Sequence, residues 1–120
     1  PSDNAYEYNF TVSNFNDKGR SEVNLEYTLM LKTTTNLPLS YELYMNNDEN
    51  NILISEEIVK DEYGTYFNVM KTNKEIFNYK DNKTNSYKLK VKFPKVYDSF
   101  DYQDIVEAIF LEVDSKQLIN

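Results

Sequence analysis

The chain has 120 residues and a net charge of −7, and it contains no histidine and no cysteine. These absences exclude a Ser-His-Asp triad, histidine acid–base catalysis, a zincin helix, a disulfide and a thiolate nucleophile. The acidic balance disfavours nucleic acid and anionic membrane surfaces as partners, and no apolar run is long enough to span a membrane. We therefore expect one non-catalytic domain over residues 1–120, without a cofactor.

The first strand is predicted at about residues 5–13, after a frayed polar start at 1–4. Its apolar positions, Tyr6, Tyr8, Phe10 and Val12, alternate with polar residues, which is typical of a strand with one buried face. A turn-rich loop is expected over 13–20.

The clearest pattern in the chain predicts two long strands at its centre. Over 22–33, apolar side chains recur at every second position from Val23 to Leu31, and Tyr27 belongs to this inward set. Pro38 cannot donate a ladder hydrogen bond, so it marks a corner before the next strand, at about 40–46.

The middle of the chain is less regular. Residues 45–51 form a hydrophilic loop, and the apolar runs 52–54 and 58–59 predict either two short edge strands or one bulged strand. A strand is expected at 66–70, and the segment 71–80 suits a short strand or a helical turn.

Two further elements are predicted in the last third. Over 86–94, Tyr87, Leu89, Val91 and Phe93 point inward, while the lysines between them form a solvated face that discourages edge-to-edge pairing. A short helical turn at 101–105 is followed by a last strand at 106–114; the alternative is a helix over 102–113.

The total of about seven to nine strands predicts an all-β fold, an antiparallel β-sandwich with jelly-roll or immunoglobulin-like connectivity. Four segments then resemble the TasA/camelysin group of secreted surface and matrix proteins of Firmicutes. They are YNFTVSN (8–14), EVNLEYTLMLKTTTNLPLSYELY (22–44), YKLKVKFP (87–94) and DYQDIVEAIFLEVDSKQ (101–117).

The resemblance implies a jelly-roll-like sandwich, export, and a role in the biofilm matrix, extracellular fibres or cell envelope of a Gram-positive bacterium. In fibre-forming relatives an N-terminal region supplies an intersubunit strand, and that region is expected to precede residue 1. The metallopeptidase label of some members is not expected to transfer, because this chain has no histidine.

Three acidic groups have a possible chemistry, each weighed against a plainer interpretation. The loop oxygens of Asn46, Asp48 and Asn50 suit weak calcium binding but lack EF-hand spacing, so a solvated loop is preferred. Helix capping is preferred for Asp98, Asp101 and Asp104. A glycosidase carboxylate pair is disfavoured for the surface acids Glu56, Glu57, Asp61 and Glu62.

The functional expectation is a protein–protein contact, with the protein itself or another matrix protein as partner. Fibre assembly by strand addition is the expected route, and Tyr6, Tyr8, Phe10 and Val12 of the first strand are the interaction candidates. The alternative is a carbohydrate-binding or adhesin module that uses exposed aromatic side chains. Most tyrosines in phase with aliphatic residues are assigned to the core (Tyr6, Tyr8, Tyr27, Tyr41, Tyr87), and four others to exposed contacts (Tyr44, Tyr63, Tyr66, Tyr97).

Overall fold

Ten β-strands and no helix make up the part of the chain that the computed structural model describes, residues 3–35, 39–94 and 109–119. Seven of these strands have six or more residues: β1 (Asp3–Ser13), β4 (Asn24–Thr34), β5 (Ser40–Met45), β6 (Ser55–Lys60), β7 (Tyr66–Lys71), β9 (Thr84–Pro94) and β10 (Ile109–Leu118). The other three are short: β2 (Phe15–Asn16), β3 (Gly19–Arg20) and β8 (Glu75–Phe77). The all-β prediction is confirmed.

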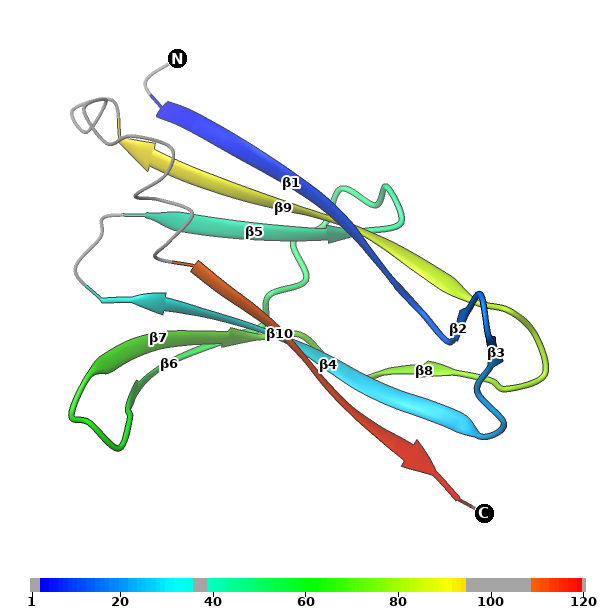
Figure 1. Ribbon diagram of the computed structural model, residues 1–120. Helices are drawn as coiled ribbons and strands as arrows, with labels where there is room; N and C mark the ends of the chain where they lie inside the picture. The colour runs from blue at the N-terminus through cyan, green and yellow to red at the C-terminus, as the bar shows by residue number, and fades with distance from the viewer. Residues whose placement is uncertain (1–2, 36–38, 95–108, 120) are drawn as a thin grey trace.

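The long strands form two antiparallel sheets, which stack as a sandwich (Figure 1). One sheet has the order β1-β9-β5, and the other has the order β10-β4-β7-β6, with β8 paired to β4 beside β7. The pairs β4-β7, β7-β6 and β9-β5 match those of an immunoglobulin sandwich when the seven long strands are counted in chain order. The first and last strands have exchanged sheets, so β1 lies beside β9 and β10 lies beside β4.

Alternating side chains from both sheets form the core. β4 contributes Tyr27, Leu29 and Leu31, each at most 2% exposed, and β5 contributes Leu43. β9 contributes the buried residues of its inward face (Tyr87, Leu89, Val91). Each fully buried leucine stabilises the fold by about 1.5–3 kcal/mol relative to an exposed one, so these strands carry most of the packing energy.

Two buried tyrosines join the sheets by a polar contact. The hydroxyl of Tyr27 on β4 lies 2.5 Å from that of Tyr87 on β9, and Asn85 Nδ2 donates to the Tyr27 oxygen at 2.7 Å. Burial, and then the bond to Tyr27, raises the pKa of Tyr87 above its ordinary value. Both hydroxyls stay neutral, and the contact places β9 directly over β4.

Most expected strands are present within a few residues of their predicted ends. The chain around 52–54 is not a strand, and only 58–59 belongs to one, β6. The loop at 13–20 contains the small β2-β3 ladder, and 71–80 contains a strand, β8. The last strand is confirmed over 109–114, so a helix there is wrong. The helical turn at 101–105 lies outside the described residues.

Candidate interaction surface

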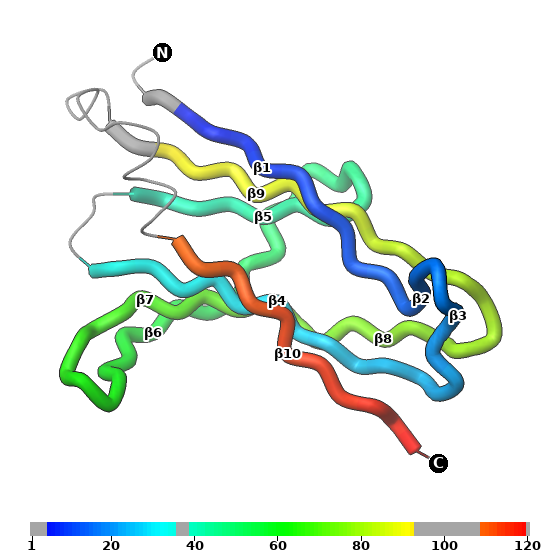
Figure 2. Tube along the Cα trace, viewed as in Figure 1, coloured from blue at the N-terminus to red at the C-terminus, as the bar shows by residue number. Residues whose placement is uncertain are grey.

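Strand β1, the predicted interaction strand, lies at an edge of its sheet (Figure 2). It is antiparallel to β9 over its whole length, from the pair Asp3–Pro94 to the pair Ser13–Thr84. No other strand in the described ranges pairs with β1, and alternate residues of an edge strand direct backbone N–H and C=O groups away from the sheet. An edge strand of this kind can pair with a further strand through its backbone.

The four candidate side chains share the inward face of β1. Tyr6, Phe10 and Val12 are half-buried and pack against the core, whereas Tyr8 is 58% exposed. Assigning Tyr8 to the core was therefore wrong. Its ring stacks on Phe10, with centroids 5.7 Å apart, and Phe10 stacks on the buried Tyr87 at 5.2 Å. These two contacts connect the buried Tyr87 to the exposed ring of Tyr8.

Strand β10, at an edge of the other sheet, also has inward-facing side chains that are partly exposed to solvent. Ile109 and Leu111 are half-buried, and Val113, which lies opposite the buried Leu29, is 50% exposed. Strands β1 and β10 lie on the same side of the sandwich, nearest the viewer in Figure 1. We call this the open side, defined by the inward-facing side chains of the two edge strands (Tyr8, Phe10, Val12, Ile109, Leu111, Val113).

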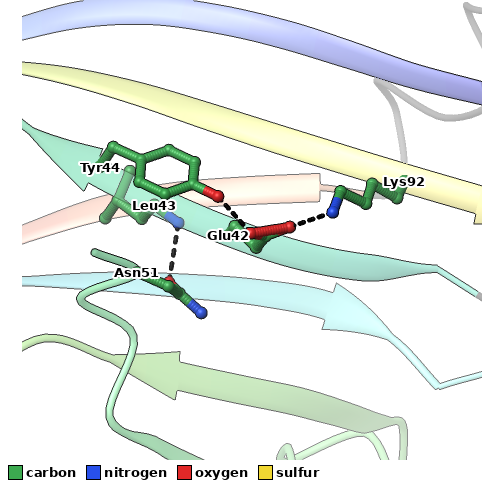
Figure 3. A network of polar contacts seen from close by, with 5 residues as sticks. All are labelled: Glu42, Leu43, Tyr44, Asn51 and Lys92. Atoms are coloured by element: carbon green, nitrogen blue, oxygen red, sulfur yellow. Dashed lines mark hydrogen bonds and ion pairs between the residues drawn. The ribbon is translucent and has the colours of Figure 1, made fainter. Parts of the chain in front are cut away.

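The opposite edge of the β1 sheet is covered at its centre. On β5, the backbone N–H of Leu43 donates to Asn51 Oδ1 at 3.0 Å (Figure 3). The Leu43 carbonyl accepts from Ile52 N–H at 2.8 Å. Asn51 Oδ1 also accepts from Leu53 N–H. Residues 51–53 therefore block the middle of β5 from pairing with another chain.

The outer face of the same sheet holds a charged and aromatic network. On β5, the Tyr44 hydroxyl donates to the carboxylate of Glu42, which also pairs with the Lys92 ammonium of β9 (Figure 3). The bonds from Lys92 and Tyr44 lower the pKa of Glu42. The bond to Glu42 raises the pKa of Tyr44 to about 12. The tyrosine is neutral and the carboxylate is charged at ordinary pH. The Tyr44 hydroxyl can therefore donate to Glu42, and this bond holds the ring along the strand.

Beside this network is a groove of about 720 Å³, between β1, β9 and the loop after β5. Lys88 and Lys90 of β9 line it, together with Asn9 of β1, Tyr44 of β5 and Asp48 of the loop. The sequence predicts the polar outer face of each strand. It does not predict that the loop contributes to a groove over them.

The loop after β5, for which a solvated loop is preferred to a weak calcium site, has two of its three candidate side-chain oxygens bonded to backbone N–H groups. Asn46 Oδ1 accepts from Ser86 N–H at 2.8 Å, and Asp48 Oδ1 accepts from Asn50 N–H at 2.8 Å. Asn46 has a φ of 54°, in the left-handed region that asparagine tolerates. These bonds give the loop a structural role. The solvated loop stays the preferred prediction, and weak calcium binding stays the disfavoured one.

The acids of β6 and its turn, which are disfavoured as a glycosidase pair, lie in different settings. Glu56 and Glu57 are neighbours on a strand and face opposite ways; Glu57 Oε1 lies 3.9 Å from Lys71 Nζ. Asp61 Oδ1 accepts from Tyr63 N–H and Thr65 N–H, which shapes the turn to β7. Within the described ranges, no three metal-ligating side chains gather. Asp98, Asp101 and Asp104 lie outside the described residues.

The tyrosines assigned to exposed contacts differ in their settings. Tyr63 is 84% exposed in the β6-β7 turn and Tyr66 is 52% exposed, whereas Tyr44 is half-buried in the groove. Tyr97 lies outside the described residues. Only Tyr44 among the described three lines a concave surface.

One structural residue escaped the sequence analysis. Asn14, 4% exposed, donates through Nδ2 to the carbonyls of Asn78 and Asp81 and accepts from Lys83 N–H at 2.7 Å. It anchors the end of β1 to the loop between β8 and β9. An asparagine in a stretch of turn residues gives no sign of burial, so no local signal could have found it.

Comparison with protein-family models, with curated proteins and with solved structures finds no match. The resemblance to the TasA/camelysin group therefore stays a prediction. In the ranges that the structure describes, no helix has the length and apolar character of a membrane span.

Proposed function

We propose that the protein is non-catalytic and acts by contact with other polypeptides, with a strand of a second copy added at the edge of β1. The observation that carries this proposal is the open side, where both edge strands leave inward-facing apolar side chains half in solvent. A β-strand laid against β1 would gain backbone hydrogen bonds, each contributing about 0.5–1.5 kcal/mol net, and would cover Tyr8.

The contrast with β5 supports β1 as the docking edge. Residues 51–53 satisfy the backbone of Leu43 at the centre of β5, so an incoming strand would have to displace them. β1 offers eleven residues in a continuous ladder, and its outer edge has no partner strand in the described ranges.

An inward-facing lysine in place of Tyr8 tests the proposal. Tyr8→Lys places a charge where the added strand would cover it, and it costs the monomer little because Tyr8 is already 58% exposed. Sedimentation velocity over a wide concentration range should show self-association of the wild-type chain and its loss in Tyr8→Lys. Tyr63→Lys, at an 84% exposed site in the β6-β7 turn, is the matched control and should associate like wild type.

A wild-type chain that stays monomeric at all concentrations would refute self-association through β1. So would a Tyr8→Lys variant that assembles as the wild type does. We also propose, on the TasA/camelysin resemblance, that the protein works outside a Gram-positive cell. Detection in the cell-wall and medium fractions, and not in the cytosol, tests that location.

A further inference from the structure

The groove on the outer face of the β1-β9-β5 sheet opens on the other face of β1 from Tyr8. Side chains of β1 alternate, so Asn9 and Thr11 line the groove from the outer face, and Phe10 between them borders it, whereas Tyr8 does not line it. The groove floor is β9, with Lys88 and Lys90, and one wall is the loop that carries Asp48. Its volume of about 720 Å³ lies in the range of sites for small ligands, about 300–1,000 Å³.

Tyr44 gives the groove an aromatic surface of fixed orientation. Its hydroxyl is bound to Glu42, and Glu42 is bound in turn to Lys92, so the ring is tied at the end farthest from the backbone (Figure 3). An aromatic side chain held in place loses little conformational entropy when a ligand covers it.

The charged groups that line the groove include both acids and bases. Three carboxylates and two ammonium groups line it (Glu7, Asp48, Glu49, Lys88, Lys90). A phosphate or a carboxylate ligand would meet the three acids, and a cation would meet the two lysines. A neutral ligand with many hydroxyls would find both donors and acceptors, since amides and hydroxyls lie among the charges.

The ammonium group of Lys90 is a hydrogen-bond donor for a ligand in the groove. It is half-buried and lies in register between Glu7 of β1 and Glu42 of β5, yet it forms no ion pair with another described residue. Lys88 is held only loosely, with Nζ 3.8 Å from Glu7 Oε2 and both side chains about half exposed. Asp48 is fixed by its bond to Asn50 N–H.

We propose that this groove binds a carbohydrate chain. One sugar ring stacks on Tyr44, and the hydroxyls of that ring and its neighbour bond to Lys88, Lys90, Asn9 and Asp48. This proposal does not depend on strand addition at β1, which uses the backbone edge of that strand.

Titration with cellopentaose, maltopentaose and chitopentaose, followed by amide NMR spectra, tests the proposal. At least one of the three should shift the signals of Asn9, Tyr44, Lys88 and Lys90. Tyr44→Ala should weaken that binding about tenfold or more, because the stacking surface is lost. Tyr44→Phe keeps the ring but releases it from Glu42, so its loss should be smaller.

Two control variants distinguish the groove from the rest of the surface. Tyr63→Ala removes a more exposed tyrosine outside the groove, and Tyr8→Lys alters only the open side, so both should bind the sugar like wild type. Lys90→Met should weaken binding several-fold, and it serves as the second variant if Tyr44→Ala does not fold. The proposal fails if none of the three sugars shifts the groove signals, or if Tyr44→Phe, Tyr44→Ala and Lys90→Met all bind normally. It also fails if sodium acetate produces the same shifts at the same concentration, which would make the groove a small-anion site.

Discussion

Strands β1 and β5 are the two edges of one sheet, on either side of β9, but they differ in how far their side chains are buried and in whether another segment caps their backbone. β5 contributes a fully buried side chain, Leu43, and residues 51–53 cap the backbone at the same position. β1 is nearly twice as long, but its inward side chains are half-buried or exposed, and none of the described strands covers its edge. The difference separates two tasks: β5 closes the core, and β1 leaves a place for another chain.

The largest expected difference between the two strands is in packing energy. Leu43→Ala should lower the free energy of unfolding by about 3 kcal/mol, because Leu43 is 1% exposed and the cavity cannot fill. Val12→Ala should cost about 1 kcal/mol, since Val12 is half-buried at the open side. Urea denaturation of both variants checks this. Equal losses would mean that β1 is packed as tightly as β5, which contradicts the comparison.

Removal of the Asn14 anchor at the end of β1 should cause the next largest loss in the free energy of unfolding. Asn14→Ala removes three side-chain hydrogen bonds to the loop at 78–83 and should cost about 2 kcal/mol. Amide hydrogen exchange should speed up in β1 more than in β5, because the anchor holds β1. Asn73→Ala, at an exposed asparagine, is the control and should change neither measurement. Uniform acceleration across both strands would argue against a local anchor.

Removing the cap of β5 should make the two edges more alike. Asn51→Ala leaves Leu43 N–H and Leu53 N–H without their acceptor and should cost about 1 kcal/mol. It should also raise self-association in sedimentation velocity, since a second edge becomes available for pairing. The neighbouring change Asn50→Ala should leave association as in the wild type. If Asn51→Ala is as stable and as monomer-rich as Asn50→Ala, the cap has no protective role.

The smallest expected effect is the titration of Glu42 on the outer face of β5. Its lowered pKa means that the stabilisation from Lys92 and Tyr44 is present above the ordinary carboxyl pKa and is lost as pH falls through the lowered value. Tyr44 has the opposite sign: its pKa of about 12 favours the fold below pH 10, and that contribution is lost as pH rises toward 12.

Lys92→Met should raise the pKa of Glu42, as measured by NMR titration of its carboxyl carbon, and should flatten the acid side of the stability profile. Lys88→Met removes a cation that is not bound to Glu42 and should shift that pKa less. An unchanged pKa in Lys92→Met would contradict the ion pair.

The strands were predictable because alternation of apolar and polar residues is a local property. The periods of β1, β4 and β9 placed them almost correctly, and the buried positions Leu29, Leu31 and Leu89 followed from the same pattern. Alternation tells which face a side chain takes, but not whether another element covers that face. Tyr8 has the phase of a core residue and is exposed because it lies on an edge strand.

The candidate sites depended on contacts that the sequence does not encode locally. The apolar run at 52–54 suggested a strand, but Asn51 and Ile52 bind the backbone of β5, so this segment caps an edge instead. The loop at 46–50 was correctly placed between strands, yet its contribution to a groove with β1 residues follows from folding alone. Such contacts between distant segments can be predicted only when the order of strands in the sheets is known.

The pairing of β1 with β9 bears on how the chain is made. Asp3 lies opposite Pro94 and Ser13 lies opposite Thr84, so β1 must wait during synthesis until β9, about 70 residues later in the chain, has been made. At about 5–20 residues per second, that delay lasts several seconds. During synthesis β1 therefore has no ladder on either side. A nascent chain that stalls before Thr84 would leave the eleven residues of β1 without β9, and they could then pair with another nascent chain nearby.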